Sequence, residues 1–434
     1  MNLKTTTIKK IAGLYSKFFK VKSSKNVEKF IETLLFVFIA TGISKGLWFV
    51  INIVGGRVLG PSLYGEFTLV QAITEIIVIP VGIGVTTGIM KYLAETDKKE
   101  RITKLISTAT TYFFITLIPL VAIYTILNNQ IADIFNTGNH LVLLAIFLSI
   151  FWALNGFLEQ VLQGLHAQKK WSKFSTIAYI TSAIVFVYIL FTSSTTILLL
   201  YVPYLVTFVV FSAQGITYIW KFIKPKEFSS KYLKELTSYG IIAFLVYIAT
   251  TFLGNVDRIM INYILGATQL GFYQAYYLSS IMILGVLFGI FIRVFFPTAA
   301  KHKDPEGMTK KLDKIAPIGF FGAIIISMIT IYISLYLYNY EYNIISGIIF
   351  SVVTAISFLV VIYSNLLNAQ STKSIKKTLW GMIGAFLINI PLNYFLIKSI
   401  GINGAIISTG ISFLLLVVYI RINLSKISSS KQSQ

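Results

Sequence analysis

Long apolar runs separated by short polar stretches fill the chain from residue 31 to residue 422. A helix rises about 1.5 Å per residue and the hydrocarbon core of a bilayer is about 30 Å thick, so runs of roughly 20 residues can cross it. Backbone N–H and C=O groups in lipid must be paired within the segment, which favours helices. The pattern predicts twelve transmembrane helices, at residues 31–55, 65–90, 105–127, 140–163, 173–193, 195–220, 237–261, 272–297, 315–337, 342–368, 378–398 and 402–422.

The connections between these runs alternate between two kinds. One kind is basic and includes KYLAETDKKERITK and KFIKPKEFSSKYLKE, whereas the other is nearly uncharged and includes GPSLYG and GATQLG. The basic connections and the two termini together hold 32 of the 37 Lys and Arg residues. Because Lys and Arg in short loops stay on the cytoplasmic side, both termini are predicted to be cytoplasmic, and the crossings to be even in number.

Composition agrees with a membrane protein and narrows its chemistry. Of the 434 residues, 56% are hydrophobic and 12% are charged, about half the charged fraction of a soluble domain. No cysteine is present, which excludes disulfides, thiolate nucleophiles and Cys-based metal sites. The net charge of +21 lies in the predicted cytoplasmic loops and termini, so we expect it to reflect membrane orientation and not a nucleic-acid partner.

A short motif occurs twice, 206 positions apart. Residues 56–67 read GRVLGPSLYGEF and residues 262–273 read NYILGATQLGFY, so that Gly60 and Gly65 match Gly266 and Gly271. Each copy falls between the first two helices of a six-helix unit. We therefore predict an all-α integral membrane protein with two six-helix lobes, related by a pseudo-two-fold axis along the membrane normal. The predicted parts are a basic N-terminal segment (1–30), an N-lobe (31–221), a basic linker (222–236), a C-lobe (237–423) and a cytoplasmic tail (424–434).

The glycine motif is not a phosphate-binding loop. Such a loop needs Lys and Ser or Thr after its second Gly, and Glu66 and Phe67 stand there instead. The predicted outer loops are too short to hold an enzyme site, and His140, His166 and His302 show no metal-ligand spacing. We expect no catalytic residue and no metal site. In the first 30 residues, IAGLYSKFFKV predicts an interfacial helix on the inner leaflet, with a solvated basic tail as the alternative.

Charged and polar residues inside predicted spans are the candidate functional residues, because burying a charge in a bilayer costs at least about 2.5–3.5 kcal/mol. Lys45 and Glu75 reach similar depths, so they either form a structural pair or contact cargo. Adjacent residues on a helix do not face each other, so the Asp257 and Arg258 side chains must find separate partners. The candidates for a substrate-binding cavity are Lys45, Glu75, Asn155, Glu159, Asp257, Arg258 and Arg293.

Further polar residues form helical stripes. Asn155, Glu159 and Gln163 recur every four residues and share a face, as do Asn389 and Asn393. Such stripes must face a cavity or another helix. Most aromatic residues near span ends are expected to lie in an interfacial belt, including Trp48, Trp152, Trp171, Trp220 and Tyr338.

Several of these stretches resemble one known family. The run GRVLGPSLYGEFTLVQAI, followed by VGIGVTTGIMKYLAE, is similar to the start of Wzx/RfbX-type polysaccharide flippases. VDRIMINYILGATQLGFYQAYYLSS resembles the start of their second half, and LNAQSTKS and SIGINGAIISTGIS resemble later segments. The family belongs to a superfamily with MATE drug exporters and MurJ-type lipid II flippases; MurJ-type members usually have two further helices, which are not found here.

The resemblance implies a non-enzymatic transporter in the plasma membrane. It would move a prenyl-(pyro)phosphate-linked oligosaccharide from the inner to the outer leaflet by alternating access. Its partners would be that polyprenyl-linked cargo, membrane lipids and glycan-assembly enzymes, and its only cofactor a coupling cation, H⁺ or Na⁺. Two alternatives stay open: a MATE-like ion-coupled exporter of cationic drugs or metabolites, and, disfavoured by the short outer loops, a membrane enzyme of glycan assembly.

Overall fold

The computed structural model describes residues 25–192, 196–281, 285, 305–341, 343–368 and 372–432, and the regular structure in these ranges is helical. Ten of the helices described are long and apolar enough to cross a membrane. The predicted fold class, an all-α membrane protein built from two lobes, is confirmed. The predicted interfacial segment before residue 25 lies outside the described residues, as does Arg293.

The N-lobe begins with two helices that meet at the first glycine motif, as predicted, and share the label α2. The label covers 53 residues, and the non-helical conformation of Gly60 (φ 70°, ψ 171°) divides them. The helices of this lobe are α2 (Lys25–Ile77), α3 (Val85–Ala94), α4 (Lys99–Ile126), α5 (Asn128–Phe135), α6 (Asn139–Gly164), α7 (Gln168–Thr192) and α8 (Leu198–Ile219). Two short 3₁₀ helices, Trp220–Phe222 and Pro225–Glu227, follow in the linker.

The C-lobe repeats this order after the linker. Its helices are α9 (Ser230–Leu265), a helix over 267–281, α11 (Pro305–Tyr338), α12 (Ile344–Asn368), α13 (Thr372–Ile400) and α14 (Ile402–Gln432). Gly266 separates the first two with φ 86° and ψ 171°, nearly the conformation of Gly60. The motif repeat in the sequence is thus a repeat in the backbone. Helix α14 continues into the stretch expected to be a tail.

Two sequence predictions differ from the structure in the N-lobe. The predicted helix 65–90 is interrupted, because residues 78–84 form turns that contain Pro80 together with Gly82 (φ 65°) and Gly84 (φ 73°). Positive φ ends a right-handed helix, and glycine adopts it at little cost. The outer loop after α4 contains α5, which buries Ile131 and Phe135 against the lobe.

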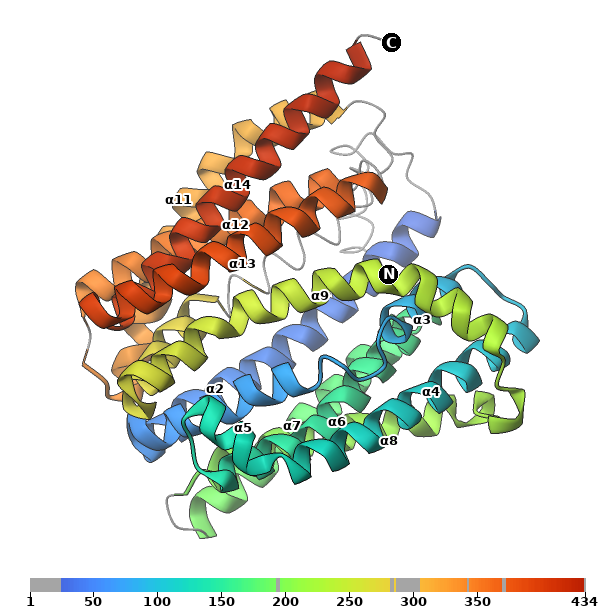
Figure 1. Ribbon diagram of the computed structural model, residues 1–434, viewed down its shortest axis with the longest axis horizontal. Helices are drawn as coiled ribbons and strands as arrows, with labels where there is room; N and C mark the ends of the chain where they lie inside the picture. The colour runs from blue at the N-terminus through green and yellow to red at the C-terminus, as the bar shows by residue number, and fades with distance from the viewer. Residues whose placement is uncertain are drawn as a thin grey trace, which may run out of the picture.

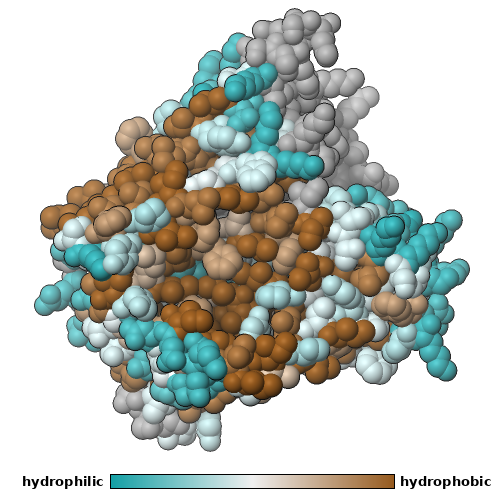
Figure 2. Space-filling model, in the orientation of Figure 1, coloured by the Kyte–Doolittle hydropathy of each residue, from teal (hydrophilic) through white to brown (hydrophobic). Residues whose placement is uncertain are grey.

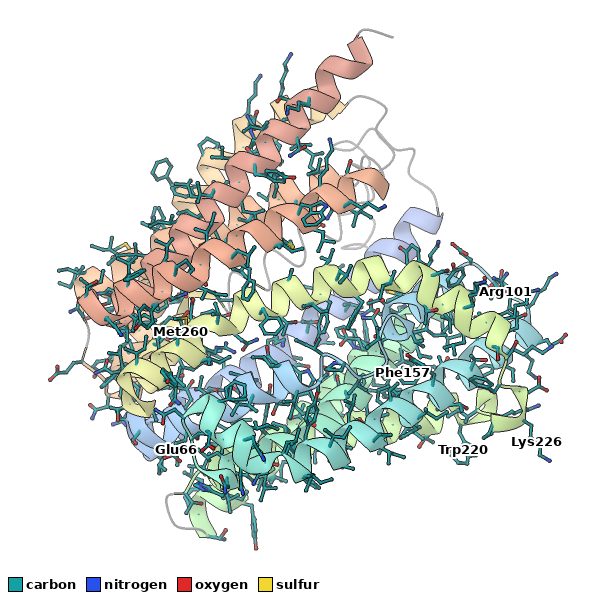
Figure 3. The ribbon with its side chains drawn as sticks, viewed as in Figure 1. Glu66, Arg101, Phe157, Trp220, Lys226 and Met260 are labelled. Atoms are coloured by element: carbon teal, nitrogen blue, oxygen red, sulfur yellow. The ribbon has the colours of Figure 1, made fainter. Side chains whose placement is uncertain are left out.

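The molecular surface has an apolar zone between two polar ends. Figure 2 shows hydrophobic residues across the middle of the visible face, over both lobes, with hydrophilic residues gathered mainly at its ends. Arg101 and Lys226, from two basic loops, lie at one end of the N-lobe, and Glu66 of the glycine motif lies toward the other (Figure 3). The basic and uncharged loops are therefore segregated at opposite ends, as the alternation along the sequence predicted.

Helices α11 to α14 meet the N-lobe at one end and diverge from it at the other, whereas α9 stays packed on the N-lobe there, with Thr87 donating a 3.1 Å hydrogen bond to the Gly240 carbonyl oxygen. In Figure 1, α11 to α14 approach the N-lobe at the end that carries the glycine motifs and diverge toward the end where α2 begins and α14 finishes. Buried contacts follow the same division. The largest apolar cluster combines N-lobe Phe67 and Leu200 with C-lobe Leu270 and Leu335. Another buried cluster, which includes Leu312 and Leu366, belongs to the C-lobe alone.

Candidate functional site

The two glycine motifs pack directly against each other where the lobes meet. A Cβ placed on Gly65 would lie 1.8 Å from the Ala267 carbonyl oxygen, and one on Gly271 would lie 1.9 Å from the Pro61 carbonyl oxygen. Pro61 and Ala267 are themselves matching positions of the two motifs, so the contact is reciprocal. Only glycine permits this backbone-to-backbone approach. The motifs are thus the lobe contact itself, a role that the sequence alone did not reveal.

Tyrosines surround this contact. The buried hydroxyls of Tyr64 and Tyr338 lie 3.1 Å apart, on α2 and α11, and Tyr340 donates a 2.9 Å hydrogen bond to the Gly56 carbonyl oxygen. Asn262 of α9 donates to the Phe135 carbonyl oxygen of the N-lobe at 3.1 Å. Since each bond joins one lobe to the other, this end of the interface is closed by both packing and hydrogen bonds.

A charged network crosses the lobe interface further along the helices. The Asn255 side chain donates from Nδ2 to Glu75 Oε2 at 2.9 Å, and its Oδ1 accepts a 3.2 Å bond from Arg258 Nη1. The guanidinium lies 4.7 Å from the centre of the Tyr277 ring, a cation–π contact. Arg258 is only 8% exposed, and its Nε is buried with no partner among the described residues. One amide therefore connects an acid of α2 with a cation of α9.

Asp257 turns away from this network into the C-lobe. Its carboxylate accepts hydrogen bonds from Thr409 (2.6 Å), Asn393 (2.8 Å) and Tyr273 (3.0 Å). Asp257 is 4% exposed and forms no ion pair within the described part of the chain. Asn389, the other member of the α13 polar stripe, donates a 3.3 Å hydrogen bond to Thr409 Oγ1 of α14, which confirms that this stripe faces other helices. The expectation that Asp257 and Arg258 have separate partners is likewise confirmed.

The remaining candidates line a cavity of about 400 Å³ inside the N-lobe, which we call the N-lobe cavity. Helices α2, α6, α7 and α8 enclose it. Its lining residues are Thr41, Ser44, Lys45, Trp48, Trp152, Asn155, Glu159, Trp171, Ser175, Ala178, Tyr179, Tyr204, Thr207, Phe208 and Phe211. Lys45, Asn155 and Glu159 are thus brought to one space, and Gln163 donates a 3.1 Å hydrogen bond to Glu159 Oε1.

The structure decides between two alternatives for Lys45 and Glu75 and corrects one prediction about aromatic side chains. Lys45 and Glu75 form no ion pair, because Lys45 lines the N-lobe cavity whereas Glu75 reaches Asn255 across the lobe interface. Most of the five aromatic residues expected in a membrane belt lie inside the protein. Trp48, Trp152 and Trp171 line the N-lobe cavity and Tyr338 is 1% exposed, while Trp220 is 69% exposed. Aromatic residues near span ends can lie either at the membrane interface or in the wall of a cavity, and residue type alone does not distinguish the two positions.

The candidates therefore fall into three places: the lobe interface (Glu75 and Arg258), the C-lobe interior (Asp257) and the N-lobe cavity (Lys45, Asn155 and Glu159). Sequence reasoning missed Asn255. The sequence did indicate this residue, because Asn255 stands three residues before Arg258 on the same face of a predicted span.

Solved structures with the same fold are MATE transporters. The chain matches the inward-facing conformation of a multidrug resistance MATE family transporter of the MOP superfamily with a TM-score of 0.66 and 14% identity, covering 91% of this chain and 99% of that one. The outward-facing conformation of such a transporter gives 0.59 at 15% identity, covering 91% and 96%. A MOP superfamily transporter from Pyrococcus furiosus, described as having a binding pocket of reverse polarity, gives 0.56 at 16% identity, covering 91% and 96%. These likenesses establish the two-lobed fold.

Sequence comparison identifies the family. None of the curated proteins matches the chain. A family model described as "Polysaccharide biosynthesis protein" matches residues 31–303, which is more than half of the chain and includes both glycine motifs. The match agrees with the resemblance in the motifs themselves, and the chain, which has the fold of the MATE transporters that it matches, belongs to the polysaccharide biosynthesis protein family.

Proposed function

We propose that the protein moves a prenyl-(pyro)phosphate-linked oligosaccharide from the inner to the outer leaflet of the plasma membrane, without changing the covalent structure of this cargo. The observation that carries the proposal is the buried Glu75–Asn255–Arg258 network, which lies where α9 packs against the N-lobe, beside helices α11 to α14 that approach the N-lobe at the glycine-motif end. Membership of a polysaccharide biosynthesis family supports a glycan cargo. Glycan-assembly enzymes at the inner leaflet would supply it.

Arg258 is the group best suited to the anionic part of such a cargo. Guanidinium groups bind phosphate oxygens with two parallel hydrogen bonds. Arg258 uses one nitrogen for Asn255 and keeps Nε unpaired, at a depth where an unpaired donor is costly. A phosphate that reached the lobe interface would satisfy it. Glu75 would keep its bond to Asn255, which in turn holds the Arg258 guanidinium in position for the phosphate.

The closed end and the separated end fit alternating access. With the basic loops in the cytoplasm, the lobes part toward the inner leaflet, where the cargo would enter. The better match to an inward-facing than to an outward-facing transporter fold supports this orientation of the opening. Transport would then need the glycine contact to separate while the other end closes.

Asp257 is the residue that we assign to the coupling cation, H⁺ or Na⁺. A buried carboxylate without an ion-pair partner is costly, and a bound cation or proton removes that cost. The oxygen atoms of Thr409 and Tyr273 lie within 3.0 Å of it, and Asn393 Oδ1 is buried without a partner among the described residues. This oxygen-rich set fits a hard cation. The charge state of Asp257 would then bias the packing of α9 against α13 and α14.

The proposal is tested in proteoliposomes that contain a prenyl-linked saccharide with a fluorescent label on its sugar. A membrane-impermeant reductant bleaches only the outer-leaflet label unless the protein moves inner-leaflet molecules outward. We expect complete bleaching with the protein, partial bleaching without it, and no movement of a labelled phospholipid. Vesicles that expel a cationic drug but leave the saccharide in place would refute the proposal in favour of a drug exporter.

A further inference from the structure

The N-lobe cavity has a lining unlike that of the helices around it. Seven of its fifteen lining side chains are aromatic, seven are polar or charged, and the last is Ala178. None of these described lining residues is Leu, Ile, Val or Met, although such residues make up much of α6 and α8. From this lining we infer that the N-lobe cavity is a saccharide-binding site, which receives sugar rings of the cargo. The inference rests on the proposed function and adds a site separate from Arg258.

A sugar ring matches this lining chemically. A pyranose has an apolar C–H face that packs on an aromatic ring and an edge of hydroxyl groups that need hydrogen-bond partners. A lipid tail or an apolar drug would bury Lys45, Asn155 and Glu159 against a surface that offers no partner, which is costly. The 400 Å³ volume lies within the roughly 300–1,000 Å³ of ligand pockets.

The cavity also holds free hydrogen-bonding groups. The Lys45 ammonium, the Asn155 amide and the Tyr179 hydroxyl make no hydrogen bond within the described part of the chain. The Thr41 hydroxyl is buried there without a partner. Buried polar groups are normally paired, as the Ser44 hydroxyl on the same wall is with the Ala40 carbonyl oxygen, so the buried Thr41 hydroxyl is an exception. Several hydroxyl groups of one ligand would satisfy the unpaired set together.

The aromatic wall is held in place before any ligand binds. Trp48 stacks on Tyr204 with ring centres 4.6 Å apart, and Trp152 contacts Tyr204 at 5.9 Å and Phe208 at 5.0 Å. Trp152 also lines a smaller cavity of about 120 Å³ that includes Tyr247 of α9. Trp152 is therefore a shared wall, and a cargo whose phosphate lies at the lobe interface can place its sugars on the N-lobe side.

The tryptophan distribution allows a direct binding test. Three of the five tryptophans line the cavity, and the other two, Trp220 and Trp380, are 69% and 66% exposed. A full-length Trp220→Phe/Trp380→Phe variant in lipid nanodiscs would therefore report on the cavity alone. Its emission is measured while glucose, galactose, N-acetylglucosamine and glucuronate disaccharides are added, and separately while farnesyl diphosphate, which has no sugar, is added.

We expect saturable emission changes with saccharides and none with farnesyl diphosphate. Tyr179→Phe or Asn155→Ala in the same background removes one hydrogen bond to sugar, which raises the dissociation constant about 3- to 10-fold. Tyr188→Phe, on the lipid-exposed face of the same helix, is the matched control and should change nothing. The idea fails if no disaccharide changes the emission up to its solubility limit, or if Tyr188→Phe weakens binding as much as Tyr179→Phe.

Transport separates this inference from the proposed function. If labelled prenyl-linked saccharide still flips at the normal rate, at concentrations below saturation, in Tyr179→Phe and Asn155→Ala proteins whose disaccharide binding is weakened, the protein is a flippase and the cavity is not its sugar site. If disaccharides bind with the expected ranking but no prenyl-linked saccharide flips, the cavity is a saccharide site and the flippase proposal fails.

Discussion

Replacing Gly65 or Gly271 by Ala is expected to open the closed end of the lobe interface. The added Cβ would lie 1.8 Å from the Ala267 oxygen or 1.9 Å from the Pro61 oxygen, whereas ordinary contacts begin at 3.4 Å. The two backbones must therefore separate by about 1.5 Å, and neither obstacle is a side chain that can rotate away. The pseudo-symmetric arrangement means that both variants push the same two turns apart.

The size of the effect follows from the cost of overpacking. Inserting a methyl group into a packed contact costs about 1–3 kcal/mol, and each 1.4 kcal/mol changes an equilibrium constant tenfold. The ratio of closed to open forms should therefore fall about 5- to 150-fold. Two conformations of one protein usually differ by only a few kcal/mol in free energy. A change of this size is then enough to make the open form the more populated one.

Spin labels measure the shift directly, because the chain has no cysteine of its own. A pair at Ile134 and Ser399 reports on the closed end, and a pair at Lys98 and Lys376 reports on the other end; all four side chains are exposed. We expect the first distance distribution to lengthen and the second to shorten in Gly65→Ala.

Gly46→Ala is the control for this experiment, because it adds a methyl group to the same helix where no atom lies within 4 Å. The reasoning is refuted if Gly65→Ala and Gly271→Ala proteins fold normally and keep the distance distributions of Gly46→Ala.

Three further outcomes are expected from the buried polar groups. Tyr338→Phe removes the hydroxyl that faces Tyr64, so it should lower stability by about 1–2 kcal/mol, visible as a lower Tm in the same detergent; an unchanged Tm would contradict this role for the pair. Arg258→Ala should lower flipping more than Arg57→Ala at equal expression, because Arg258 is buried in the lobe interface whereas Arg57 is exposed; equal residual rates would remove the ranking. If Asp257 takes the coupling cation, Na⁺ or mild acid should raise the Tm of the unaltered protein, and Asp257→Asn should abolish that response; a response that survives the substitution would place the cation elsewhere.

Much of the architecture could be predicted from the sequence because the membrane simplifies the problem. Runs such as residues 140–163 and 342–368 have only one stable solution in lipid, a helix, and their bounds agree closely with α6 and α12. The predictions were poorest where glycine and proline act on the backbone. Residues 78–84 break a helix that was predicted to continue from 65 to 90, because Gly82 and Gly84 adopt positive φ there.

The sequence by itself determined the order of the apolar helices, the alternation of basic and uncharged connections and the repeat that divides the chain into two lobes. These features are local or periodic, so they can be read one segment at a time. Only the tertiary structure decided which polar groups meet. Lys45 and Glu75 have matching depths but face different neighbours, and Gly65 and Gly271 touch although 206 positions separate them. Depth in a membrane is set by position along a helix, whereas contact is set by the rotation and crossing of helices, which side-chain packing across the whole bundle fixes.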